Sequence, residues 1–167
     1  DKFKRVNDTY GHAVGDVVIK GLGAVLTRCR RETDAVGRFG GEEFVVVCEE
    51  TDTHGAFQLA ERIREELGRQ VFATEQGPLS VTCSLGIAEF PRDASDRVAL
   101  FTRADEALYA AKNNGRNQTR TADGQSSMDA KSQGVREGAR KPAVARRESL
   151  RPAPSGRGGH SATTTAS

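Results

Sequence analysis

Val36-Gly37-Arg38-Phe39-Gly40-Gly41-Glu42-Glu43-Phe44-Val45-Val46-Val47 predicts two β-strands joined by a tight corner. The adjacent glycines at 40 and 41 permit positive φ, and because they lack Cβ atoms they let a ligand approach the backbone closely. Glu42 and Glu43 stand at the corner, where strand alternation points them to opposite sides, so one of them can face a ligand or a metal. A Gly-Gly corner alone is most often only a turn, so its function depends on the neighbouring motifs.

The flanking sequence predicts helices and strands on both sides of this corner. The predicted elements are a helix over 13–31, strands over 33–38 and 43–49, a helix from Phe57 to Leu67 with Gly68 as its stop, a strand over 79–90, and a helix from Val98 to Ala111 that ends at Asn114-Gly115. This order favours an α+β fold, in which helices pack on a central and mostly antiparallel sheet. One strand, the first, is missing at the front of the order.

The chain divides into a folded part, residues 1–120, and a tail, residues 121–167. All seven Phe and every strong apolar period lie in the folded part, which is long enough to build one core. We predict that the tail is disordered, because its Ser, Gly, Ala, Pro, Thr and Arg residues bury too little apolar surface. The folded part carries 17 Lys/Arg and 19 Asp/Glu and the tail 8 and 4, so the mild basicity belongs to the tail. No aromatic residue interleaves the tail's charges, and nucleic acid is not an expected partner.

Three cysteines, Cys29, Cys48 and Cys83, lie far apart in apolar segments. This spacing fits no metal site and predicts buried, reduced thiols in a cytoplasmic protein. The sequence contains no signal peptide and no apolar run of membrane-spanning length. The chain opens without Met at Asp1, inside a motif, so we expect a piece of a longer protein. A membrane anchor of that parent, if it has one, is expected in the region upstream of Asp1.

Two polar clusters are candidates for nucleotide binding. Asn7 and Asp16 can together read a purine edge, since a carboxylate accepts from the N1 and N2 donors of guanine. Their alternative role is to cap helices, which spacing alone favours. Lys112 and Arg116 can clamp phosphates, or they can complement the dipole of the helix that ends beside them.

Taken together, these motifs resemble the GGDEF domain of diguanylate cyclases over residues 1 to about 120. The resemblance is carried by Asp1-Lys2-Phe3-Lys4, Asn7-Asp8, Tyr10-Gly11-His12, Gly15-Asp16, Gly40-Gly41-Glu42-Glu43-Phe44 and the run from Lys112 to Asn117. Such a domain is similar to polymerase palm and nucleotide cyclase cores, with a ferredoxin-like core. Its members join two GTP molecules into cyclic di-GMP, a bacterial second messenger, and two domains face each other as a homodimer.

The resemblance also implies a role for each matching residue. Asn7 and Asp16 would bind guanine, and Gly40 and Gly41 would let the phosphates approach the hairpin. Lys4, Lys112 and Arg116 would hold the phosphates, with Lys4 counted among the catalytic residues. Glu42 would be a metal ligand, and Glu43 would support the chemistry of the metal or the nucleophile. Magnesium is the expected metal, because hard oxygen ligands and phosphates suit it.

Two points concern activity and its control. Members of the family carry a metal-binding Asp two residues before the position of Asp1, so the chain is expected to turn over weakly or not at all. Arg31 and Asp34 resemble the Arg-x-x-Asp site at which cyclic di-GMP inhibits these enzymes, although an Arg ending a helix and an Asp starting a strand would give the same pattern. Two alternatives to a cyclase remain: a module that binds GTP or cyclic di-GMP without catalysis, and a dimerisation platform.

Overall fold

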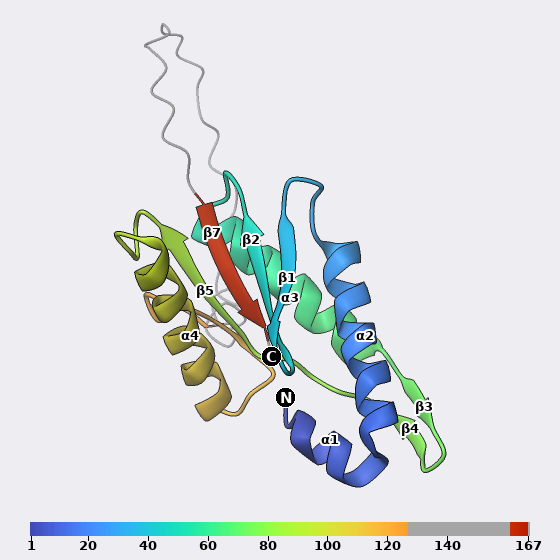
Figure 1. Cartoon of the computed structure of the whole chain (residues 1–167). Helices are drawn as coiled ribbons and strands as arrows, with labels where there is room; N and C mark the ends of the chain where they lie inside the picture. Colours follow the sequence, from blue (N-terminus) through green and yellow to red (C-terminus); the bar gives the residue numbers. More distant parts are fainter. Residues whose placement is uncertain (127–160, 167) are drawn as a thin grey trace, which may run out of the picture.

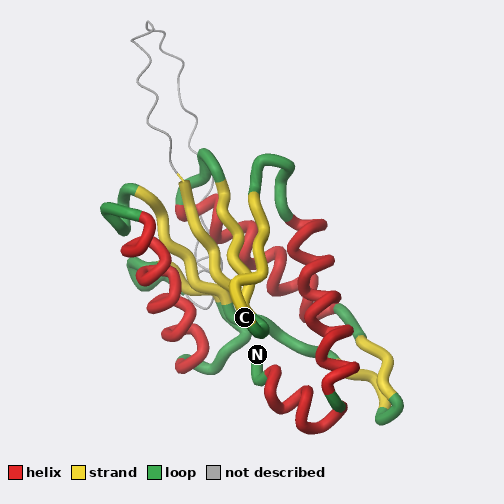
Figure 2. The backbone as a smooth tube through the Cα atoms, in the orientation of Figure 1, coloured by secondary structure: helices red, strands yellow, loops and turns green. Residues whose placement is uncertain are grey.

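A computed structural model of the chain describes residues 1–126 and 161–166 and has a five-stranded sheet at its centre, in the order β1-β2-β7-β5-β6 (Figure 1). Its elements are α1 Phe3–Tyr10, α2 His12–Cys29, β1 Ala35–Gly40, β2 Glu43–Cys48, α3 Thr53–Arg69, β3 Phe72–Thr74, β4 Gly77–Leu79, β5 Leu85–Phe90, α4 Arg97–Asn113, β6 Thr119–Thr121 and β7 Ser161–Ala166. Neighbouring strands are antiparallel except β5 and β6, and β3 and β4 form a separate hairpin (Figure 2). The predicted α+β fold is therefore confirmed.

Alternation along β5 divides the core between the two faces of the sheet. Leu85 and Ile87 belong to the larger cluster, which α2 and α3 complete. Ala88 packs with Leu100 and Ala104 of α4 on the opposite face. Side chains of a strand point alternately to its two faces, so one apolar strand supplies both clusters. The helices α2 and α3 thus cover one face and α4 covers the other (Figure 1).

The predicted hairpin is present, with a bulge near its corner. β1 pairs with β2 from Ala35 opposite Val47 to Gly40 opposite Glu43, and the register shifts between Arg38 and Gly40. Gly41 has a φ of 45°, in the left-handed region that glycine adopts without strain. The corner therefore needs its glycine for backbone conformation, as the sequence predicted.

One predicted strand, over 79–90, is wrong in its first half. β4 ends at Leu79 and β5 begins at Leu85, and residues 80–84 between them join neither sheet. The hydroxyl groups of Thr82 and Ser84 donate to the carboxylate of Asp1 instead. Apolar alternation in this segment thus reflects its burial against α1 and α2, without strand pairing.

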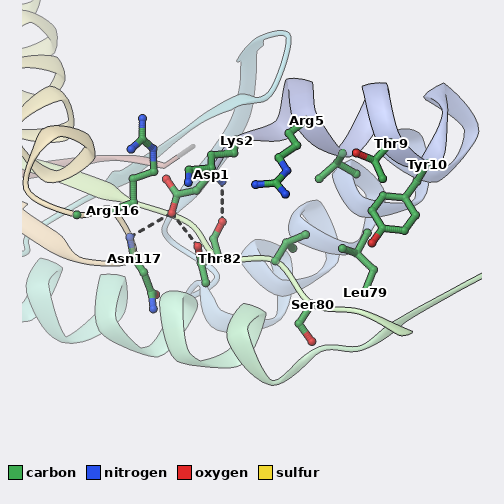
Figure 3. Close-up of a pocket in the computed structure, with 13 residues that line it drawn as sticks. Asp1, Lys2, Arg5, Thr9, Tyr10, Leu79, Ser80, Thr82, Arg116 and Asn117 are labelled. Carbon is green, nitrogen blue, oxygen red and sulfur yellow. Dashed lines mark hydrogen bonds between the residues drawn. The ribbon is translucent and has the colours of Figure 1, made fainter. Parts of the chain in front are cut away.

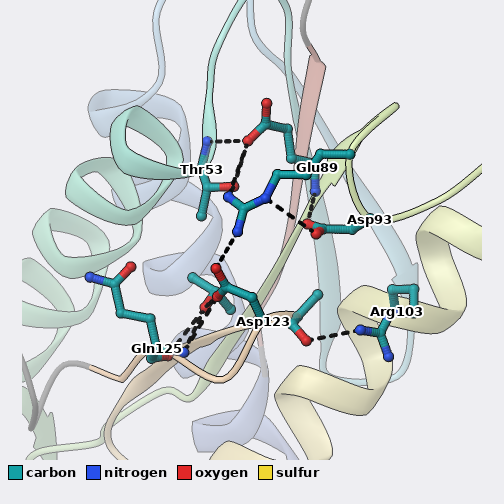
Figure 4. A network of polar contacts seen from close by, with 9 residues as sticks. Thr53, Glu89, Asp93, Arg103, Asp123 and Gln125 are labelled. Atoms are coloured by element: carbon teal, nitrogen blue, oxygen red, sulfur yellow. Dashed lines mark hydrogen bonds and ion pairs between the residues drawn. The ribbon is translucent and has the colours of Figure 1, made fainter.

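The prediction of disorder from residue 121 onward is wrong for residues 121–126, which pack on the rest of the fold. Thr121 ends β6, and Arg120 bridges to Ser126. Asp123 forms an ion pair with Arg92, which lies beside the buried carboxylate of Glu89 (Figure 4). Glu89 also accepts hydrogen bonds from the backbone and the hydroxyl of Thr53, at the start of α3. This network ties residues 121–126 to β5 and α3.

The C-terminal residues 161–166 were predicted to be disordered, and this is wrong as well. They form β7, which lies between β2 and β5 and pairs with both (Figure 1). Two strands with facing free edges satisfy both backbone edges of a third strand, and small or β-branched side chains fit between the two helical layers. The place of the strand expected to be missing is therefore filled. The remainder of the predicted tail, residues 127–160, lies outside the described residues.

All three cysteines are buried free thiols, as predicted. Burial is the main cause that raises the pKa of Cys48 and of Cys83 to about 12. Among the helices that the structure describes, none has both the length and the apolarity needed to cross a bilayer.

Candidate active site

Asp1 is held at the meeting point of α1, the segment before β5 and the turn after α4 (Figure 3). Its carboxylate accepts hydrogen bonds from the hydroxyl of Thr82 at 2.9 Å, the hydroxyl of Ser84 at 2.7 Å and the backbone N–H of Asn117 at 3.2 Å. Its α-amino group donates to the carbonyl oxygen of Thr82 at 2.7 Å. Sequence reasoning missed Thr82 and Ser84, because two hydroxyl residues at alternate positions carry no signal of their own, and it named Asn117 only as the end of the run that starts at Lys112.

The hairpin corner brings its two carboxylates to the same region. Asp1 and Glu42 line one small cavity of about 20 Å³. Glu43 lies 3.9 Å from the ammonium nitrogen of Lys112, which extends from the last turn of α4. Arg38 donates through Nε to the carbonyl oxygen of Gly41 at 2.9 Å, which braces the corner from its outer side. Both carboxylates are half-buried, and Glu42 has no ionic partner among the described residues.

Burial lowers the pKa of the α-amino group of Asp1, and the charges of three predicted site residues also shift this pKa. Glu42 acts to raise this pKa, whereas Lys112 and Arg116 act to lower it. Arg116 lines the same pocket as Asp1, Glu42 lines the same small cavity as Asp1, and Lys112 lies 3.9 Å from Glu43 at the hairpin corner. The structure thus gathers the acidic corner and the basic helix end around one point.

A pocket of about 440 Å³ opens on the other side of Asp1 (Figure 3). Three cationic side chains, Lys2, Arg5 and Arg116, line it together with Tyr10. Arg116 has a φ of 61° and follows Gly115, whose φ is 104°, so the turn after α4 aims this residue away from the helix axis. Lys2 and Arg5 were not singled out in the sequence, although their spacing places them on one side of the chain that enters α1.

Asn7 and Asp16 lie inside α1 and α2, so the capping alternative is wrong for both residues. Gly11 is the boundary residue between these helices, and no side chain caps either of them there. A Cβ atom at Gly15 would lie 1.9 Å from the Oδ1 atom of Asn7, so glycine allows the two helices to meet at this residue. The Oδ1 atom of Asn7 is buried without a hydrogen-bond partner, whereas Asp16 is exposed. Lys4 is exposed on α1 and makes no contact with the hairpin carboxylates in the described part of the chain.

The Arg31 and Asp34 pair lies at the opposite end of β1 from the Gly40 corner. Asp34 is buried, and its carboxylate accepts a hydrogen bond from the backbone N–H of Arg31 at 2.7 Å. Its second carboxylate oxygen is buried and has no hydrogen-bond partner among the described residues, while the side chain of Arg31 is exposed. A small cavity of about 60 Å³ beside them is also lined by Cys48 and Arg62. Asp34 therefore braces the turn into β1, and this pair is separate from the residues around Asp1.

The donor chemistry of the corner suits a hard cation. Magnesium retains several waters and is typically held by one or two carboxylates together with substrate phosphates. Glu42 and Glu43 supply such oxygens, whereas all the hydrogen bonds of the Asp1 carboxylate are to protein groups. The described residues contain no cluster of three or more acidic, His or Cys side chains suited to a metal ion. Glu42 and Glu43 are thus the carboxylates at this corner that could supply oxygens to a cation.

Comparison with known proteins gives a consistent result. Residues 1–118 match the family model described as "Diguanylate cyclase, GGDEF domain". Diguanylate cyclase A of Treponema denticola is 39% identical over 118 residues, which are 71% of this chain and 32% of that protein. The structure of the active GGEEF domain of a diguanylate cyclase from Vibrio cholerae superimposes with a TM-score of 0.68 at 36% identity, covering 73% of this chain and 77% of that one.

A second solved structure, the GGDEF domain of DgcB from Caulobacter crescentus in complex with c-di-GMP, is also similar. Its TM-score is 0.68 at 32% identity, and the match covers 74% of this chain and 73% of that one. The chain spans about a third or less of the length of the curated relatives that it matches.

Proposed function

The chain belongs to the GGDEF domain family of diguanylate cyclases, and we propose on that basis that it joins two GTP molecules into cyclic di-GMP. In each half-reaction, the 3′-oxygen of one nucleotide forms a bond to the α-phosphorus of the other, and the bond to pyrophosphate breaks. One domain binds one GTP, so the reaction requires two copies that face each other. Since GTP is the substrate, we expect the parent protein to present this domain to the cytoplasm.

The proposal is carried by one arrangement: Glu42 and Arg116 line cavities together with Asp1, and Lys112 lies 3.9 Å from Glu43 at the same hairpin corner. A triphosphate carries several negative charges, and the two cations lie beside the acidic corner that would face a metal-bound phosphate. Arg116 offers a planar fork to phosphate oxygens, and Lys112 acts as a point charge. With GTP bound, Lys112 would exchange its 3.9 Å contact with Glu43 for a phosphate oxygen.

Guanine recognition is assigned to the corner between α1 and α2. The amide oxygen of Asn7 is buried and lacks a donor, and the carboxylate of Asp16 is exposed one residue beyond Gly15. Guanine offers N–H donors at N1 and N2 that would satisfy both acceptors, whereas adenine has no donor at either position. Lys4, exposed on the same helix, would add positive charge for the phosphates.

Glu42 would hold the magnesium ion, and Glu43 would orient the attacking hydroxyl and accept its proton. When bound, the cation would neutralise charge on the phosphates and make the hydroxyl more acidic. Gly40 and Gly41, where no Cβ atoms protrude, would let the phosphates reach the hairpin backbone.

Product inhibition is assigned to Arg31 and Asp34. The related DgcB domain was solved in complex with c-di-GMP. Here Asp34 has one carboxylate oxygen without a donor, and Arg31 is free to turn toward a ligand. An Arg31→Ala variant should bind cyclic di-GMP at least tenfold more weakly in calorimetry, while Lys20→Ala, at an exposed position on α2, serves as the control. Equal affinity of the Arg31→Ala variant and the unmodified chain would rule out this site.

The deciding experiment is to incubate the chain with GTP and magnesium and to detect cyclic di-GMP by mass spectrometry, beside a Glu43→Gln control. Cyclic di-GMP from the unmodified chain and none from the Glu43→Gln control would support the cyclase function. A second candidate, a module that binds GTP without turnover, is favoured by the three protein hydrogen bonds that the carboxylate of Asp1 already accepts. Saturable binding of a fluorescent GTP analogue with no product would support this second function.

A further inference from the structure

The turn after α4 has a backbone conformation that its sequence does not favour. Gly115, Arg116 and Asn117 have φ values of 104°, 61° and 45°, so three consecutive residues lie in the left-handed region. Glycine adopts this region freely, whereas arginine has a steric penalty in it and asparagine enters it mainly as a single residue. Residues strained in this way persist only where the surrounding structure holds them. The turn therefore needs contacts from outside itself to keep its shape.

This turn is important to the site because both of its non-glycine residues lie beside Asp1 (Figure 3). The backbone N–H of Asn117 donates to the Asp1 carboxylate, and the side chain of Arg116 lines the same pocket as Asp1. Arg116 is half-buried, and its guanidinium has no ionic partner among the described residues. The direction of this side chain is therefore set by the backbone of the turn.

Gln118 holds the turn from inside the fold. Its side chain is buried, with the residue only 1% exposed, and the amide nitrogen reaches the carbonyl oxygens of Ala111 at 3.2 Å, Asn114 at 2.5 Å and Arg116 at 3.4 Å. The two N–H groups of this amide are thus shared among three acceptors. One acceptor belongs to the last turn of α4, where carbonyl groups lack partners within the helix. A single side chain therefore ties the end of the helix to the turn that follows it.

Two neighbouring contacts complete the support. Arg120 donates through Nε to the Oε1 atom of Gln118 at 3.2 Å. Because an arginine side chain can only donate, this bond keeps the amide oxygen away from the carbonyl groups and the NH2 group toward them. From α3, the guanidinium of Arg64 donates to the side-chain oxygen of Asn117 at 3.0 Å. Arg64 thus restrains the side chain of Asn117, whereas Gln118 restrains the backbone of Arg116.

We propose that Gln118 is a positioning residue that acts on GTP through Arg116. Its amide fixes the left-handed backbone of the turn, and that backbone directs the Arg116 guanidinium toward the phosphates. This role rests on the proposed function, in which Arg116 binds phosphate. Gln118 itself touches no substrate, because it is buried and both polar atoms of its side chain are bonded to protein groups. Its replacement should displace Arg116 without deleting any group that binds GTP.

Hydrogen exchange tests the hold on the turn without reference to GTP. In the full chain, Gln118→Met keeps an unbranched side chain of similar length and removes both donors. The backbone amides of Arg116 and Asn117 should then exchange about tenfold faster or more in NMR spectra, because their bonds to Ala111 and Asp1 open more often. Unchanged exchange of these two amides would overturn the proposal.

A matched control separates local opening from a general loss of stability. Thr53→Val removes a buried hydroxyl that donates to Glu89, at the opposite end of β5 from the turn, and should leave the two turn amides unchanged. Equal acceleration in both variants would contradict a local role for Gln118. If Gln118→Met does not fold, the unmodified chain still decides the question. The side-chain NH2 protons of Gln118 should exchange slowly in it, and rapid exchange of these protons would overturn the proposal.

GTP binding tests whether Gln118 acts through Arg116. Displacement of a fluorescent GTP analogue gives the affinities of the unmodified chain, of Gln118→Met, of Arg116→Ala and of the double variant. Each single variant should bind GTP about tenfold more weakly or less tightly still, and the double variant should stay within about twofold of Arg116→Ala. Losses that multiply in the double variant, or unchanged affinity of Gln118→Met, would overturn the proposal. Absence of GTP binding by the unmodified chain would instead refute the proposed function, and the exchange rates would still decide whether Gln118 holds the turn.

Discussion

Gly86→Ala should strongly destabilise the domain, because α4 rests directly on the backbone of β5. A Cβ atom at this position would lie 2.1 Å from the carbonyl oxygen of Ala104, 2.3 Å from the nitrogen of Leu108 and 2.9 Å from its Cα atom. All three atoms belong to the backbone of a helix, so no side chain can rotate away and the whole helix must shift. Overpacking typically costs about 1–3 kcal/mol, and a backbone clash belongs at or above the upper end of that range.

We therefore expect the free energy of unfolding to fall by about 3 kcal/mol, which is roughly 6–12 °C in Tm for a chain of this size. The assay is urea and thermal unfolding followed by circular dichroism. The matched control is Gly68→Ala in α3, where an added Cβ meets nothing within 4 Å. This control should be neutral or slightly stabilising, because alanine is favoured in helices by up to about 1 kcal/mol. A loss below about 1 kcal/mol for Gly86→Ala would refute the close contact of α4 with β5.

Three further predictions concern the site and the core. Lys112→Ala should raise the KM for GTP about tenfold or more, because it removes a phosphate-binding charge. Lys20→Ala, at an exposed position, should leave the KM unchanged. Equal KM values for the Lys112→Ala variant and the unmodified chain would show that Lys112 does not belong to the site. Thr164→Val should raise the free energy of unfolding by about 1 kcal/mol in urea titrations, because it deletes an unsatisfied buried hydroxyl; a loss of stability would contradict this reading. Burial raises the pKa of Cys48 and Cys83 from 9.0 to about 12. The contribution of these neutral thiols to the free energy of unfolding is therefore complete below pH 9.0 and is lost as the pH rises toward 12. Between these pH values, the free energy of unfolding of the unmodified chain should fall more steeply with pH than that of a variant with one thiol replaced by alanine. The difference in slope should be about 1.4 kcal/mol per pH unit for each thiol, measured from unfolding curves at several pH values. Identical slopes would show that the thiols are accessible.

The sequence predicted the hairpin and the long helices because their signals are local. Adjacent glycines specify a corner, and apolar residues at helical spacing specify α2, which was predicted over 13–31 and lies at His12–Cys29. The motifs around Asn7, Glu42 and Lys112 were also found, since each combines unusual residues at close spacing. What local patterns cannot give is the set of partners that hold Asp1, because Thr82 and Asn117 are distant in sequence and chemically ordinary.

β7 shows a different limit of sequence reasoning. Its sequence, Ser-Ala-Thr-Thr-Thr-Ala, has no apolar alternation and follows a long polar segment, so composition alone predicts disorder. The strand forms because β2 and β5 present free backbone edges on either side of it. Its stability therefore depends on the two strands that flank it, and no pattern within the six residues encodes it.

The contact between Lys112 and Glu43 depends on two packing interfaces that contain neither residue. Glu43 begins β2, and the next residue, Phe44, is the register partner of Ala166 at the end of β7. Lys112 sits on the last turn of α4, whose position is set by its close approach to Gly86. A change at Gly86 or loss of β7 should consequently separate the cation from the carboxylate, which now lie 3.9 Å apart. We expect such variants to bind GTP more weakly at temperatures where circular dichroism still reports a folded domain, and unchanged GTP affinity under those conditions would show that the site is positioned independently of the sheet.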